Sequence, residues 1–193
     1  MNRELLREEA LRYGATAAVF IKAPSISVED ELVEMCRAPG CAGYGKSANC
    51  PPHVMGPREA KSFIAGFEEA LFFKLDVEPV LLFSDERFRI FELIFRIAAG
   101  LEIKARSSGF KKARALAAGS CKPVFCNDEP CDVLSGSGEC RHPSLARPSM
   151  EALGINVFKL AHGVGWPIHR MTKVSNPGEI SSAMVAGILL FSI

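Results

Sequence analysis

The chain has 193 residues, of which 48% are hydrophobic and 23% are charged, and its formal net charge is +1. This length and composition exclude a disordered chain and fit one globular domain with a hydrophobic core, so we expect residues 1–193 to form a single domain. The small net charge also excludes a strongly basic surface of the kind that binds nucleic acid.

The first predicted element is an amphipathic helix over residues 2–13, which Gly14 ends. This segment alternates charged and apolar residues and lacks the apolar core of a secretory signal, so we expect a cytoplasmic protein. A buried strand is predicted over residues 15–21. Ser27 is placed to cap a short helix over residues 28–35, which leads into the first cysteine.

The middle of the chain contains three predicted elements. Residues 57–67 are typical of a helix, and residues 70–77 are typical of a buried strand. A long helix follows, capped by Ser84 or Asp85. Its apolar side chains share one face, as expected for a helix that packs on a sheet. They are Ile90, Phe91, Ile94, Ile97, Ala98 and Leu101.

The last part of the chain is predicted to complete the sheet. Residues 111–118 are compatible with either a helix or a buried strand. We expect a helix over residues 144–153 that Gly154 ends, a strand over 155–160 and a final strand over 183–191. Strands that alternate with helices indicate an α+β or α/β fold, with a single mixed sheet covered by helices. No apolar run is long enough to span a membrane.

Seven cysteines distinguish the chain from an ordinary cytosolic protein. A reducing cytoplasm disfavours disulfides, and an odd number of cysteines cannot pair completely within one chain. Buried structural cysteines behave as small apolar residues, whereas these lie among Gly, Pro, Ser, Asn and Asp, which form loops. The sequence therefore predicts two cysteine-rich metal-binding loops. The first contains Cys36, Cys41 and Cys50, and the second contains Cys121, Cys126, Cys131 and Cys140.

The second loop carries the stronger chemical signal, because four thiolates are a full ligand set for an iron–sulfur cluster or for tetrahedral zinc. Structural zinc sites favour cysteine pairs separated by few residues, whereas the gaps here are four, four and eight residues. A proline also follows closely after the last cysteine, as in many cluster loops. We predict a [4Fe-4S]-type cluster on Cys121, Cys126, Cys131 and Cys140, with zinc as the alternative.

The first loop offers only three thiolates, from Cys36, Cys41 and Cys50. A second metal centre there needs a fourth ligand from His53, from elsewhere in the fold or from a small molecule. The last arrangement leaves an open coordination position, which is how a bound metal becomes catalytic. A surface position after a turn is the competing interpretation of His53.

Other polar residues carry weaker signals. His142 suits either a contact with the metal centre or a solvated loop position. Residues 162–169 contain the only Trp and fit either a pocket wall or a turn. Arg141 and Arg147 are candidates for holding an anion near the start of the helix predicted at 144–153. Glycine motifs for nucleotide binding and the zinc-protease motif are absent from the sequence.

The two loops combine into a distinctive pattern: C-x4-C-x2-Y-G-K-x3-C-P-P over residues 36–52, G-S-C over 119–121 and C-R-H-P over 140–143, followed by A-R-P-S-M-E-A-x-G-I over 146–155. This pattern resembles a cysteine-rich family of predicted metal-binding proteins, which is a domain of unknown function. The resemblance covers most of the chain, from the first loop to Val157. In the second loop, the family has closer spacing after the first cysteine than this chain has.

The resemblance implies metal binding by these cysteines and an occurrence largely in anaerobic bacteria and archaea, where oxygen-sensitive clusters survive. It implies no particular reaction. Electron transfer to a redox partner protein is the leading predicted role, because a cluster carries single electrons. Two alternatives stay open: a structural zinc protein that binds a partner, and an enzyme with an open-coordinate metal at the first loop. Neither nucleic-acid binding nor membrane binding is expected.

Overall fold

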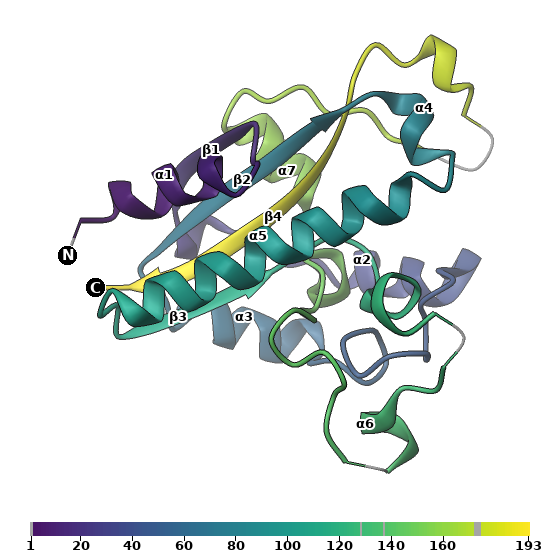
Figure 1. The fold of residues 1–193 in the computed structure, drawn as a ribbon, viewed down its shortest axis with the longest axis horizontal. Helices are drawn as coiled ribbons and strands as arrows, with labels where there is room; N and C mark the ends of the chain where they lie inside the picture. Colours follow the sequence, from purple (N-terminus) through teal and green to yellow (C-terminus); the bar gives the residue numbers. More distant parts are fainter. Residues whose placement is uncertain (1, 128, 137, 172–174) are drawn as a thin grey trace.

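The computed structural model describes residues 2–127, 129–136, 138–171 and 175–193. Four strands form one sheet in the spatial order β1, β2, β4, β3 (Figure 1). They are β1 (Ala17–Lys22), β2 (Glu69–Val77), β3 (Lys112–Leu116) and β4 (Ala183–Ser192). Each neighbouring pair is antiparallel. The predicted single sheet covered by helices is therefore confirmed as α+β, whereas the parallel pairing of an α/β or mixed sheet is not found among the described strands.

The two central strands, β2 and β4, are buried on both faces of the sheet. In β2, Leu71 and Phe73 contact one helix layer, whereas Ala70 and Phe72 contact the other. Gly187 in β4 permits this packing, because a Cβ atom there would lie 2.6 Å from the Phe73 ring. Each fully buried large apolar side chain stabilises the fold by about 1.5–3 kcal/mol, which explains the long apolar runs of both strands.

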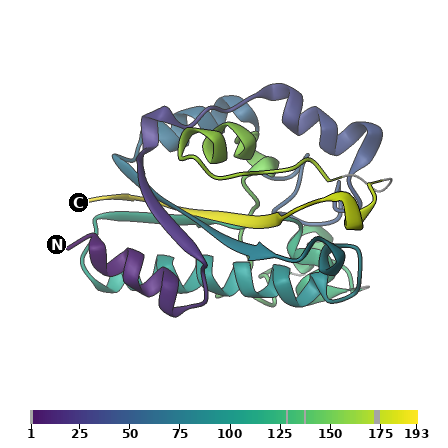
Figure 2. The ribbon, with the colours of Figure 1, turned by 90° about the horizontal axis from the view of Figure 1, so that it is seen from above.

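Helices cover both faces of the sheet, as Figure 2 shows. One face is covered by α1 (Glu4–Arg12) and α5 (Arg87–Ser107), and the other by α3 (Pro57–Ala65) and α7 (Val157–Gly163). Three shorter helices are α2 (Asp30–Met35), α4 (Pro79–Leu82) and α6 (Asp132–Ser135). None of the helices in the described parts of the chain is long and apolar enough to cross a membrane.

Most elements before the second loop lie where the sequence predicts them, and the ambiguous segment 111–118 contains strand β3. The predicted helix caps are wrong. Helix α2 begins at Asp30 and α5 begins at Arg87, and neither N-cap residue accepts a side-chain hydrogen bond. Ser84 instead accepts a hydrogen bond from the N–H of Glu86, at 3.2 Å, in the turn before α5.

The segment after the second loop differs from prediction. Only a short turn over Glu151–Leu153 is helical within residues 144–153, because Pro148 disfavours helix at the preceding residue and Ser149 pairs with Ala117 beside the sheet. Gly154 still ends this turn, with a φ of +79°.

The strand predicted over residues 155–160 is wrong, because this segment begins helix α7. The side chain of Asn156 caps α7 by accepting a hydrogen bond from the N–H of Lys159, at 3.0 Å. The buried side chains of Val157, Leu160 and Ala161 then recur at helical spacing.

The two cysteine loops lie near each other and away from the chain termini (Figure 1). The first loop follows α2 and precedes α3, and the second follows β3 and contains α6. Two elements distant in sequence therefore bring all seven cysteines to one region of the molecule.

Candidate metal centre

The two cysteine loops meet at Cys50 and Cys121, which are both buried. The Cys50 thiol donates a hydrogen bond to Ser120 Oγ at 3.3 Å, and Ser47 Oγ lies 3.2 Å from Cys121 Sγ. Gly43 permits this close approach, because a Cβ atom there would lie 2.8 Å from Ser120 Cβ and 3.3 Å from Cys50 Sγ. The loops therefore form one interlocked unit.

All four cysteines of the second loop line one cavity of about 140 Å³. Cys121 precedes a helical turn over Lys122–Cys126, so Cys126 ends the same turn. Cys131 is the residue before α6, and Cys140 lies in the loop that follows that helix. The structure thus brings together the four residues that the sequence predicts as one ligand set.

Hydrogen-bond donors contact two of these sulfur atoms. Asn49 Nδ2 donates to Cys121 Sγ at 3.6 Å, and the backbone N–H of His142 donates to Cys140 Sγ at 3.4 Å. Burial raises the pKa of the Cys126 thiol, as does the nearby charge of Cys121, while the Lys122 cation opposes the shift. The donors to Cys121 and Cys140 favour charged sulfur, which is the form that binds metal.

Charged side chains brace the backbone of the second loop. Lys122 Nζ donates to the carbonyl oxygens of Asn127 and Glu129. Arg141 donates to both carboxylate oxygens of Asp132, at 2.6 and 2.5 Å, and lies 3.6 Å from the Glu129 carboxylate. Bidentate pairs of this kind fix orientation as well as distance, so the loop holds its shape around the cavity.

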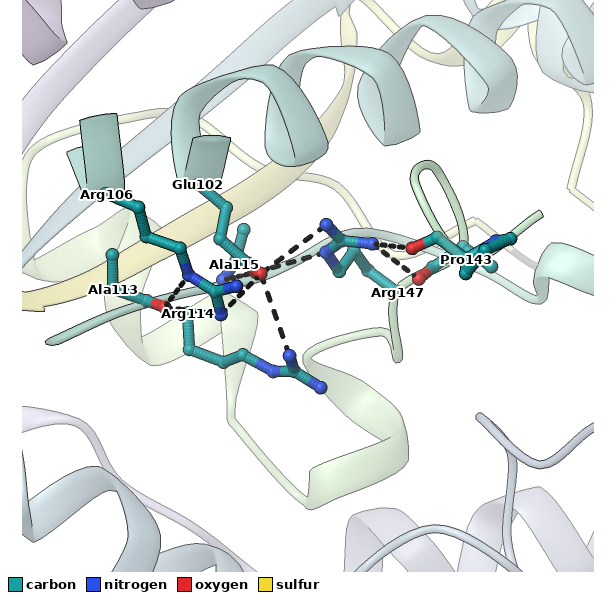
Figure 3. A network of polar contacts seen from close by, with 8 residues as sticks. Glu102, Arg106, Ala113, Arg114, Ala115, Pro143 and Arg147 are labelled. Atoms are coloured by element: carbon teal, nitrogen blue, oxygen red, sulfur yellow. Dashed lines mark hydrogen bonds and ion pairs between the residues drawn. The ribbon is translucent and has the colours of Figure 1, made fainter. Parts of the chain in front are cut away.

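A buried carboxylate anchors the chain just after Cys140 (Figure 3). The Glu102 side chain on α5 is 2% exposed and accepts hydrogen bonds from the Ala115 N–H at 2.7 Å and from Arg147 Nε at 3.1 Å. The Arg147 guanidinium in turn donates to the carbonyl oxygens of Pro143 and Ala146, at 3.1 and 2.9 Å. This network ties the end of the second loop to the long helix.

Two further arginines complete the surroundings of Glu102. Arg106 lies 2.9 Å and Arg114 lies 3.6 Å from its carboxylate. Arg147 is thus engaged inside the protein and Arg141 is paired with acidic residues, so both arginines have partners within the chain, and the anion site stays a prediction. Glu102 was not predicted from the sequence, because its role depends on Arg147 of a later segment.

The three cysteines of the first loop lie at the wall of a different and larger cavity, of about 400 Å³. Burial raises the pKa of the Cys50 thiol to about 11, and the Ser120 hydroxyl, which can donate a hydrogen bond to the charged sulfur, opposes this shift. Burial also raises the pKa of Cys36, and the charges of Cys41 and Glu151 add to that effect. Of the three thiols, Cys36 is the one whose pKa the Glu151 charge raises.

Glu151 was not predicted from the sequence, and it lines the same cavity as the three thiols. Its Oε2 atom is buried without a hydrogen-bond partner among the described residues. Burial raises the pKa of this carboxyl group, and hydrogen bonds from the backbone of Glu151 itself and from the Ser149 side chain oppose the shift. An unpaired buried oxygen is costly, so its place beside a set of thiols marks it as a candidate ligand or hydrogen-bonding group.

The structure places the histidines and the tryptophan that the sequence singles out in different environments. His53 is exposed and is not among the described residues that line the three-thiol cavity, so its ligand role stays a prediction. His142 lines the four-thiol cavity, with its ring stacked on Phe125. Trp166 is partly buried and stacks on the core residue Phe72, with ring centroids 4.9 Å apart, whereas His169 lines the larger cavity.

The donor chemistry of both loops suits metal, since thiolates bind zinc and iron–sulfur clusters. Among the described residues, no group of three or more His, Cys, Asp or Glu side chains is gathered closely enough to hold a single metal ion. The four thiols line a cavity of about 140 Å³ together with other side chains of both loops.

Comparison with known proteins gives one match. The family described as "Predicted metal-binding protein (DUF2284)" matches residues 19–191, a span that includes both cysteine loops. No curated protein and no solved structure matches the chain.

Proposed function

The chain belongs to this family of predicted metal-binding proteins, and from that premise we propose that the second loop holds an iron–sulfur cluster of the [4Fe-4S] type that transfers electrons. The ligands are Cys121, Cys126, Cys131 and Cys140. The observation that carries the proposal is that four thiols from one short segment line a single cavity.

The size of the cavity favours a cluster over zinc. A single zinc ion needs four ligand atoms at about 2.3 Å from one point, whereas the described side chains form no such tight group. A cavity of about 140 Å³ lined by four thiols is better suited to a cofactor of several atoms. Zinc is the competing outcome of the experiment below.

The surroundings of the thiols support a redox role. When bound, an iron–sulfur cluster supplies one-electron transfer at a potential that hydrogen bonds to sulfur and burial adjust. Ser47 and Asn49 of the first loop provide polar contacts to Cys121, and the His142 N–H provides one to Cys140. These groups belong to the protein and would adjust the potential of the bound cofactor.

We also propose that the first loop holds a second metal through Cys36, Cys41 and Cys50, whose thiols would have to move closer together than they lie in this structure. Glu151 is better placed than His53 to complete this site, because it lines the same cavity and its free oxygen is buried. The contact of Cys50 with Ser120, next to Cys121, gives electrons a short route between the two sites.

The second-loop site also suits exchange with a redox partner protein. Cys126, Cys131 and Cys140 are only partly buried, so a partner that docks on this loop can approach the cofactor closely. The buried thiols, Cys50 and Cys121, lie where the two loops touch. The arrangement suits electron flow from a partner through the second loop to the first.

The experiment that tests the proposal is the iron and acid-labile sulfide content of protein purified without oxygen, with its visible absorption spectrum before and after dithionite. We expect iron and sulfide in similar amounts and a brown chromophore that dithionite bleaches. Stoichiometric zinc without sulfide, in a colourless protein, would contradict the proposal and support a structural zinc site.

A further inference from the structure

The two outer strands of the sheet, β1 and β3, differ in how their free edges are covered. On an outer strand, every second residue has a backbone N–H and C=O that point away from the sheet. On β3, the Ala113 carbonyl accepts hydrogen bonds from the Arg106 guanidinium at 3.4 and 3.2 Å. The Ala115 N–H donates to the Glu102 carboxylate at 2.7 Å. Side chains of α5 therefore close this edge to another strand.

The strand registers show which groups of β1 point off the opposite edge. Opposite residues in antiparallel strands point their backbone groups either toward each other or away from each other. Ala115, which points away from β4, lies opposite Leu189, and Leu189 lies opposite Leu71 of β2. Leu71 in turn lies opposite Phe20 of β1. Phe20 and Ala18 therefore point outward, and no other described residue forms a hydrogen bond with their backbone groups.

The side chains of β1 resemble those of an inner strand. Residues 17–21 are all apolar, as in strands that are covered on both faces. Phe20 packs against the layer that contains α1 and α5, and Val19 packs against the layer that contains α3 and α7. Yet residues 17–21 are only partly buried, and no other ribbon lies over this strand in Figure 2. An exposed apolar edge without a proline is a template for another strand.

The two ends of β1 carry different exposed charges. At the C-terminal end, Lys22 is 75% exposed and shares the Glu69 carboxylate with Arg3, which leaves this end positive. At the N-terminal end, Thr16 donates a hydrogen bond at 2.9 Å to Asp76, a carboxylate that is 53% exposed. An antiparallel copy of β1 therefore brings Lys22 toward Asp76 of the other copy and keeps the two Lys22 side chains apart.

We propose that β1 is a dimer interface, at which β1 of a second copy of this chain pairs antiparallel and joins the two sheets into one. A pair of this kind is two-fold symmetric, so the same groups are satisfied on both copies. The second cysteine loop follows β3, at the opposite edge of the sheet. The dimer therefore leaves that loop of each copy free for a redox partner.

The test is the molar mass of the full chain in solution, measured by sedimentation velocity over a series of protein concentrations. The protein is purified without oxygen and kept reduced, because an exposed thiol such as that of Cys41 forms intermolecular disulfides when it is oxidised. We expect a dimer that dissociates on dilution.

Ala18→Pro and Ala113→Pro are a matched pair of variants. Each removes an N–H that points off an outer strand, so neither removes a hydrogen bond between strands of the sheet. Ala18→Pro should weaken the dimer at least about tenfold, because two-fold symmetry removes two intermolecular hydrogen bonds at once. Ala113→Pro, on the edge that α5 closes, should leave the dimer unchanged.

A wild-type chain that stays monomeric at every concentration would overturn the inference, as would a dimer that tolerates Ala18→Pro. Far-UV circular dichroism checks the fold of both variants. If Ala18→Pro does not fold, hydrogen exchange of the wild-type chain decides. The N–H groups of Ala18 and Phe20 should be protected at high concentration and exchange faster on dilution, whereas equal rates would contradict the dimer. None of these results bears on the metal sites.

Discussion

The two cysteine loops share one region of the molecule, yet they differ in the number of thiols that each provides and in the size of the cavity that those thiols line. The second loop offers four thiols around a small cavity of about 140 Å³ and is braced by ion pairs. The first offers three thiols at one end of a cavity of about 400 Å³, with an unpaired carboxylate oxygen beside them. The two loops therefore place their thiols in cavities of different size and different chemistry.

The largest expected effect comes from breaking the anchor that distinguishes the second loop. Glu102→Gln removes the charge that compensates the buried guanidinium of Arg147, so we expect a loss of about 3–5 kcal/mol in the free energy of unfolding. Chemical denaturation of the metal-loaded protein measures this change. We also expect faster loss of the second-loop cofactor, because Arg147 no longer fixes the chain after Cys140.

Glu92→Gln is the matched control for Glu102→Gln. It removes an ion pair on the surface of the same helix, with Arg96 at 2.6 Å, and exposed pairs of this kind contribute only about 0.3–0.5 kcal/mol. If both variants lost the same small amount, the Glu102 network would not be the anchor of the second loop.

A smaller effect is expected where the two loops touch. In Gly43→Ala the new Cβ atom meets Ser120 Cβ at 2.8 Å, so the loops must move apart, at a cost of about 1–3 kcal/mol in the free energy of unfolding. Thermal or chemical denaturation measures the cost. Gly163→Ala is the control, since nothing lies within 4 Å of a Cβ atom there. A stability of Gly43→Ala equal to that of the control would show that the loops do not interlock.

The smallest effect concerns the reduction potential of the cofactor proposed at the second loop, which a residue of the first loop should adjust. Ser47→Ala removes the hydroxyl that lies 3.2 Å from Cys121 Sγ. Loss of one hydrogen bond, worth about 0.5–1.5 kcal/mol, corresponds to about 20–60 mV for one electron, so we expect the reduction potential to fall by about that amount. Redox titration checks the shift, with Ser62→Ala on the exposed face of α3 as control. An unchanged potential would exclude tuning by Ser47.

The sequence predicts the parts of this molecule that depend on local pattern. The buried run of β2 and the periodic apolar face of α5 are local signals, and both elements form as predicted. The short apolar run at 155–160 is different, because it fits a strand or a helix equally well, and the cap at Asn156 decides for the helix.

Residue chemistry predicts that the four cysteines of the second loop act together, and in the structure all four line one cavity. The roles of Glu102 and Glu151 depend on contacts between elements that are distant in sequence, and no spacing rule reveals them. Glu102 acts through Arg147 of a later segment, and Glu151 lies near Cys36 of an earlier one. Both residues follow from the tertiary packing.

The proposal that the second loop, and not the first, holds the cluster is tested most directly by the iron and sulfide content of two variants, Cys126→Ser and Cys41→Ser. Both are purified without oxygen beside the wild-type protein. Each variant removes one thiol that is not fully buried, so both should keep the fold, as far-UV circular dichroism would check. We predict that Cys126→Ser loses the dithionite-bleachable chromophore with its sulfide, whereas Cys41→Ser keeps them. A chromophore that survives in Cys126→Ser, or is lost only in Cys41→Ser, would contradict the assignment of the electron-transfer cluster to the second loop.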